Sequence, residues 1–100
     1  MGEMTFEFEA QLWLYPGDAA WHFITLPREI AEEIRFFCPR RGAGWGSVRV
    51  EACIGASRWR TSVFPDKQSA SFVLPVKAEI RKREKLAAGQ TCRLSIFFEA

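Results

Sequence analysis

The chain has few of the residue types from which metal and redox sites are built. Its 100 residues include a single histidine, His22, so a metal site made of several histidines is excluded. The three cysteines, Cys38, Cys53 and Cys92, are odd in number and show no C-x-x-C spacing. This disfavours a disulfide framework and a four-thiolate zinc site. Cys92 follows the apolar pattern of its segment and is predicted to be a small core residue, whereas Cys38 is the more exposed thiol.

Long apolar runs are also missing. No segment approaches the roughly 20 apolar residues that cross a bilayer. The first residues, M-G-E-M-T-F-E-F-E, lack the apolar stretch of a secretory signal, so we expect a cytoplasmic protein without a membrane partner. The glycines of residues 40–45 neither follow an expected strand nor precede Lys-Ser or Lys-Thr, which excludes a phosphate-binding P-loop.

Catalytic constellations are equally scarce. A Ser-His-Asp site would have to join His22 to Ser62 or Ser69, and no nucleophile-elbow sequence surrounds either serine. Asp18 and Asp66 both lie in expected turns, where their side chains have a local structural role. We therefore expect a non-enzymatic protein that uses no metal and no cofactor.

The composition contains many large rings and an uneven charge. Nine Phe and four Trp can fill the core of one small domain, which we place at residues 1–100. Net charge is only +2, but residues 1–33 hold seven acids and one base, and residues 34–100 hold five acids and thirteen bases. These opposite fields either complement each other internally or steer an anionic partner to one end of the domain.

Alternating apolar and polar residues predict six half-buried strands, at residues 5–14, 21–26, 47–54, 58–64, 71–74 and 91–98. In the first strand, Leu12 and Leu14 are expected to face inward. In the fourth, the same two-residue period places Trp59, Thr61 and Val63 in the interior and leaves Arg58 and Arg60 outside.

Two helices are predicted between these strands. Pro27 and Pro75 each stand where a helix begins, because proline is favoured at the first helical position. Helical spacing predicts two apolar stripes, one with Ile30, Ile34 and Phe37 and the other with Val76, Ile80 and Leu86.

The order of elements is β-β-α-β, repeated once, with Leu26-Pro27 and Leu74-Pro75 as the matching anchors. Two such halves can close into a mainly-β, six-stranded, pseudo-two-fold (double-split) barrel with two short helices. Closure removes the sheet edges that an open sheet would expose.

Several motifs carry a family resemblance that covers nearly the whole chain. Phe8-Glu9-Ala10, Trp21-His22-Phe23 after Gly17-Asp18, Leu26-Pro27, residues 59–65 and Leu74-Pro75-Val76-Lys77 resemble DUF1905, a bacterial domain family of unknown function. Where that family usually has Gly-Asp before the last strand, this chain has Gly89-Gln90. Residues 74–96 also resemble the AbrB/MazE pattern, although the helix here is longer. The resemblance implies a double-split β-barrel related to the AbrB-like barrels, and it implies no activity.

Six basic residues are candidates for binding an anion: Arg58, Arg60, Lys67, Lys77, Arg81 and Lys82. Arginine suits bidentate contact with carboxylate or phosphate, although scattered surface charge is often only solvated. We expect a binding module for an anionic or protein partner. One alternative is an AbrB-like nucleic-acid-binding protein, whose affinity the acidic first half would keep weak. Another is a small-molecule site inside the barrel, where six strands leave little space. The sequence leaves the oligomeric state open.

Overall fold

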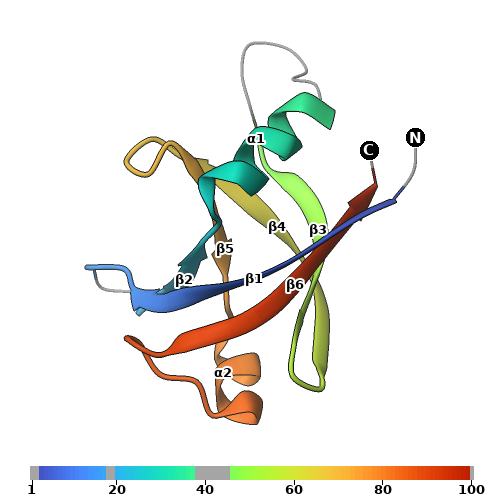
Figure 1. The fold of residues 1–100 in the computed structure, drawn as a ribbon. Coiled ribbons are helices and arrows are strands. Elements are labelled where there is room, and N and C mark those ends of the chain that lie inside the picture. Colours follow the sequence, from blue (N-terminus) through green and yellow to red (C-terminus); the bar gives the residue numbers. More distant parts are fainter. Residues whose placement is uncertain (1–2, 18–19, 38–45, 100) are drawn as a thin grey trace.

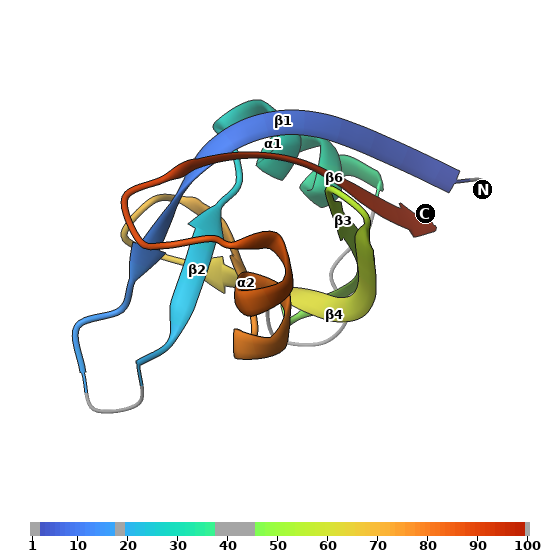
Figure 2. The ribbon, with the colours of Figure 1, turned by 90° about the horizontal axis from the view of Figure 1, so that it is seen from below.

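Six antiparallel strands close into one barrel in the computed structural model, which describes residues 3–17, 20–37 and 46–99 (Figures 1 and 2). The strands follow the order β1-β2-β5-β4-β3-β6 around the barrel. This confirms the mainly-β barrel with two helices. Along the chain the elements are β1 (Glu3–Leu14), β2 (His22–Thr25), α1 (Arg28–Phe37), β3 (Val48–Ile54), β4 (Ser57–Asp66), β5 (Ser71–Pro75), α2 (Ala78–Glu84) and β6 (Thr91–Glu99).

The barrel consists of two interlocked halves, β1-β2-α1-β3 and β4-β5-α2-β6. Each half contributes its third strand to the other, because β3 pairs with β4 and β6 pairs with β1. The ring closes where β2 pairs with β5 and β3 pairs with β6. Exchanging β1 with β4, β2 with β5 and β3 with β6 leaves this ring of pairings unchanged. The predicted repetition of β-β-α-β is therefore confirmed in the topology.

Matching backbone hydrogen bonds show which residues of the two halves are equivalent. The N–H of Leu26 donates to the carbonyl of Phe72 over 2.9 Å, and the N–H of Val76 donates to the carbonyl of His22 over 3.0 Å. Each bond becomes the other when the halves are exchanged. Leu26 thus corresponds to Val76, and His22 corresponds to Phe72.

This register corrects the expected anchors of the repeat and the start of the second helix. Pro27 accepts the first helical hydrogen bonds of α1, and Lys77 does the same for α2, so Pro27 corresponds to Lys77. Pro75 ends strand β5 opposite Phe23 and does not open the helix, which begins at Ala78. Proline is tolerated at this strand end because it needs no partner for an N–H group.

The core fills the barrel, and the two helices lie at its opposite ends (Figure 1). Ile30 and Ile34 of α1 and Ile80 of α2 are buried against the barrel core. Within the described ranges, neither helix is long and apolar enough to cross a membrane. The inward positions of the strands hold Leu12, Ile24, Val50, Ala52, Ile54, Trp59, Val63, Phe72, Leu74, Cys92, Leu94, Ile96 and Phe98.

Two residues expected on the apolar faces lie at the surface instead. Leu14 is 50% exposed because it ends β1, opposite His22 at the start of β2. Phe37 is 39% exposed at the last turn of α1, where its ring contacts Phe36 rather than the core. Both corrections concern the last residue of an element. There the side chain still follows the periodic pattern, but the core no longer extends far enough to cover it.

The fourth strand follows the predicted alternation. Trp59 and Val63 are buried, Thr61 is half-buried, and Arg58 and Arg60 are exposed. We expect Trp59→Ala to lower the free energy of unfolding by roughly 3–5 kcal/mol, because it removes a large core side chain. Arg60→Ala should cost less than about 1 kcal/mol, because this side chain is in solvent. Chemical denaturation of both variants tests the assignment, and a larger loss for Arg60→Ala would reverse it.

The two described cysteines should differ in reactivity. Burial raises the pKa of the Cys92 thiol, whereas Cys53 is half-buried; Cys38 lies outside the described residues. A raised pKa lowers the thiolate fraction, and the thiolate is the reactive form. Iodoacetamide at mildly alkaline pH should therefore alkylate Cys53 before Cys92 in the native protein, as read by peptide mass spectrometry. Equal rates in the native state would contradict the burial of Cys92, and equal rates are expected only in denaturant.

Candidate functional site

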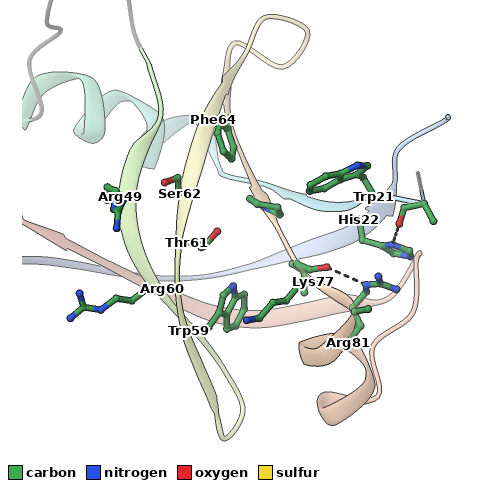
Figure 3. Close-up of a pocket in the computed structure, with 14 residues that line it drawn as sticks. Trp21, His22, Arg49, Trp59, Arg60, Thr61, Ser62, Phe64, Lys77 and Arg81 are labelled. Atoms are coloured by element: carbon green, nitrogen blue, oxygen red, sulfur yellow. Dashed lines mark hydrogen bonds between the residues drawn. The ribbon is translucent and has the colours of Figure 1, made fainter. Parts of the chain in front are cut away.

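The barrel wall is split where β4 leaves β5. Strand β5 pairs with β4 only from Phe64↔Val73 to Asp66↔Ser71, and its end pairs with β2 instead. The preceding part of β4 therefore has no strand on this side. An open pocket of about 610 Å³ occupies the split, between residues 59–62 of β4 and residues 75–81 at the end of β5 and the start of α2 (Figure 3).

Three of the six basic candidates line this pocket: Arg60 on β4, Lys77 before α2, and Arg81 on α2. Sequence analysis missed a fourth basic residue, Arg49 of β3, which reaches the pocket because it lies opposite Ser62 in the β3·β4 ladder. Its side of the strand was predictable from alternation. Its neighbours were not, because they depend on strand register.

The other three candidates lie elsewhere. Arg58 makes a 3.5 Å ion pair from its Nη1 to Oε1 of Glu51 and lines a separate hollow. Lys67 is in the β4–β5 turn, and Lys82 is exposed on α2. None of these three lines the pocket between β4 and α2.

The four basic side chains of the pocket form two pairs on opposite sides of β4. Figure 3 shows Lys77 extending toward the ring of Trp59, with Arg81 beyond it on α2, whereas Arg60 extends away from both. Arg49 lies on the same side as Arg60 (Figure 3). We name these two groups the helix pair (Lys77 and Arg81) and the strand pair (Arg49 and Arg60). Because the groups diverge, one small anion cannot contact all four residues.

One carboxylate lies beside the strand pair, because Glu51 is opposite Arg60 in the β3·β4 ladder and lines a neighbouring hollow with Arg49 and Arg60. Among the residues that the structure describes, no carboxylate lines the pocket, and Arg49 and Arg60 have no ion pair. Lys77 has only an exposed contact to Glu79 at 3.9 Å, which solvent screens. Within the described residues, the charged side chains that line the pocket are therefore all basic, and Glu51 beside the strand pair offsets part of their charge.

Backbone contacts orient two of the lining side chains. Nε of Arg81 donates to the carbonyl of Val76 over 3.1 Å, which directs the guanidinium along the pocket wall. Nδ1 of His22 donates to the carbonyl of Ala20 over 2.9 Å. This bond requires the proton on Nδ1 and leaves Nε2 without a proton in the neutral ring. The single histidine thus joins the site as a polar wall residue, a role that its place in the sequence did not indicate.

A buried hydrogen bond fixes α2 to β4. Oγ of Ser57, which is fully buried, donates to a carboxylate oxygen of Glu84 over 2.6 Å. Next to it, Gly55 has a φ of 58°, and a Cβ there would meet the Glu84 carboxylate. Only glycine therefore fits this hairpin without displacing Glu84. The contact joins the start of β4 to the end of α2, the two elements that carry the walls of the pocket.

The exchange of halves identifies an equivalent split beside β1. Ile24 corresponds to Leu74. In the first half, Leu12 is opposite Ile24. In the second half, continuing the β4·β5 ladder by one residue beyond Phe64↔Val73 places Val63 opposite Leu74. Leu12 thus corresponds to Val63, and both are fully buried. On this register β1 leaves β2 in the same way that β4 leaves β5.

None of the four basic residues has a basic counterpart in that first split. Counting along the matched strands and helices pairs Arg60 with Glu9 and Lys77 with Pro27. In the same way, Arg81 corresponds to Ala31 and Arg49 corresponds to Thr91. Ala31 of α1 is fully buried, and Oε2 of Glu9 lies 3.5 Å from Nη1 of Arg93. The same backbone frame therefore carries positive charge in one split and none at the equivalent positions of the other.

A comparison with protein families now places the chain. The family model described as "Domain of unknown function (DUF1905)" matches residues 8–96. The chain belongs to the DUF1905 family. The matched range contains every residue that lines the pocket, and the family description assigns no activity to it. A search of curated proteins gave no match. The predicted relation to AbrB-like barrels stays a prediction.

The Ser57–Glu84 hydrogen bond can be tested by truncation. Ser57→Ala leaves the half-buried carboxylate without its donor, and we expect the free energy of unfolding to fall by about 1–3 kcal/mol. Ser62→Ala is the control, because Ser62 lies on the same strand and makes no side-chain hydrogen bond within the described residues; it should change stability by less than about 0.5 kcal/mol. Equal denaturation midpoints for the two variants would show that this contact does not hold α2.

Proposed function

We propose that this DUF1905 protein is a non-enzymatic binding module that holds an anionic ligand in the pocket between β4 and α2. The observation that carries the proposal is the difference between the two splits. The fold accepts Glu9, Pro27, Ala31 and Thr91 at the positions that hold Arg60, Lys77, Arg81 and Arg49 in the second split. Because the architecture does not require positive charge there, Arg49, Lys77 and Arg81 point to a ligand. Arg60 adds to them, although it also has Glu51 opposite it, as Glu9 has Arg93 in the first half.

Their chemistry supports an anion. Arginine offers a planar fork of donors that matches phosphate or carboxylate, and lysine adds a compact charge. Arg60 and Lys77 are exposed, so a ligand can reach them without a change of conformation. The same exposure means that solvent and salt screen each contact, and we expect affinity to fall as ionic strength rises.

The surroundings of the pocket support binding rather than catalysis. His22 is the one histidine among the lining residues, and in the described part of the chain no carboxylate lines the pocket to orient it. A ligand inside the barrel is less well supported, because core side chains fill the interior. A protein partner presenting acidic side chains would satisfy the same basic residues. The expected cytoplasmic location stays a prediction.

Tripolyphosphate, a polyanion that carries no nucleobase, provides the first test. In a calorimetric titration with tripolyphosphate, Arg60→Gln and Lys77→Gln should each weaken binding by about three- to tenfold, the effect of removing one hydrogen bond made by an exposed and solvent-screened charge. Lys67→Gln and Lys82→Gln remove the same charge outside the pocket, and they should leave the affinity within about twofold of wild type.

Two results would contradict the proposal. Equal weakening by all four substitutions would show that binding follows overall charge and uses no site. An absence of heat change and of any NMR shift with tripolyphosphate at low salt would show that the pocket does not bind anions.

A further inference from the structure

A second, apolar hollow adjoins the basic pocket. It has a volume of about 340 Å³ and is lined by Tyr15, Trp21, Phe23, Phe64 and Val73. Trp21 and Phe64 also line the basic pocket, so the two hollows adjoin each other at these two rings. We name the apolar hollow the aromatic dish.

The rings of the aromatic dish pack against one another and remain open to solvent. Phe23 is the centre, and the ring of Trp21 stacks on it at 6.0 Å with an interplanar angle of 9°. Tyr15 packs edge-on against Phe23 at 6.1 Å, and its N–H donates to the carbonyl of Trp21 over 2.8 Å. Although Phe23 covers one side of Trp21, that residue is still 53% exposed, and Phe64 is 43% exposed. A rigid ring with an uncovered face is a stacking platform for another planar group.

The charges beside the aromatic dish call for more than one anionic group. The helix pair and the strand pair lie on opposite sides of β4 and point apart (Figure 3). A ligand that contacts both pairs must carry at least two anionic groups along an extended backbone. A ligand that also covers Trp21 must carry a planar apolar group next to that backbone.

Resting on the proposed anion-binding function, we infer that the ligand is a short single strand of nucleic acid. Its phosphates contact the helix pair and the strand pair, and a base stacks on Trp21, with Phe64 beside it. Base stacking on exposed aromatic side chains next to a basic groove is the general means of binding single strands without reading their sequence. Binding should be weak and tolerant of sequence, because the net charge is only +2 and residues 1–33 are acidic.

The experiment separates stacking from charge. Fluorescence anisotropy compares an oligothymidylate of about ten nucleotides, within the usual site sizes, with an abasic strand that has the same number of phosphates. The thymidylate should bind about tenfold more tightly, which is the worth of one stacked base. Trp21→Ala should remove most of this difference. Phe36→Ala is the matched control, because Phe36 is an exposed aromatic residue of α1 that lines neither hollow, and it should leave the difference intact.

The salt dependence of the affinity independently measures how many phosphates the protein contacts. For each phosphate that the protein no longer neutralises, the slope of log affinity against log salt should become shallower by about 0.7. Lys77→Gln should therefore flatten the slope for both strands, whereas Trp21→Ala should lower the thymidylate affinity without changing its slope. A flatter slope in Trp21→Ala would overturn the assignment of Trp21 to a base.

Other outcomes overturn the inference in distinguishable ways. If the two strands bound equally and tripolyphosphate still bound at Arg60 and Lys77, the proposed anion-binding function would stand. The inference that the ligand is a single strand of nucleic acid would be wrong. Equal affinity for thymidine monophosphate and the oligothymidylate would assign a free nucleotide. Tighter binding of duplex DNA would assign the AbrB-like alternative, and tighter binding of an acidic, aromatic peptide would assign a protein partner. If neither strand nor tripolyphosphate bound to the protein, both proposals would be wrong.

Discussion

Neither half of this protein can close its own sheet, and the rest of the structure depends on that constraint. β3 finds its partners in β4 and β6, and β6 finds its partners in β1 and β3, so both halves must fold together. The ladder from Glu3↔Glu99 to Gln11↔Thr91 joins the first strand to the last. Strands β1 and β4 are longer than their partners β2 and β5, which leaves one split in the wall of each half. The backbone topology of the barrel thus creates two equivalent recesses, whatever side chains line them.

The two splits have diverged in chemistry while keeping the same frame. In the first, Ala31 of α1 is fully buried, and Pro27 takes the position before the helix. In the second, Arg81 and Lys77 occupy the corresponding positions and extend along the pocket. The fully buried Ser57 hydroxyl, bonded to Glu84, anchors the far end of α2 to β4. The basic side chains that line the second recess, with no carboxylate lining it in the described part of the chain, distinguish it from the first.

Much of this fold is predictable from the sequence, because strands alternate their side chains with a period of two. The burial of Trp59 and the exposure of Arg60 follow from that period alone. The misplaced start of α2 at Pro75 and the exposure of Leu14 share one cause, since the end of an element depends on what packs against it. For the site, the basic residues near α2 were visible as candidates. The contribution of Arg49 and the aromatic dish were not, because they require the β3·β4 register and the pairing of β2 with β5.

The difference between the two splits is the central claim, and one NMR titration tests it within a single molecule. As tripolyphosphate is added to the labelled protein, we expect the backbone amides of residues 59–62 and 77–81 to shift with a common saturation curve. The amides at the equivalent positions, residues 8–11 and 28–31, should not move. Shifts of the same size in both sets, or shifts confined to the first split, would contradict the claim that the basic residues define the binding site.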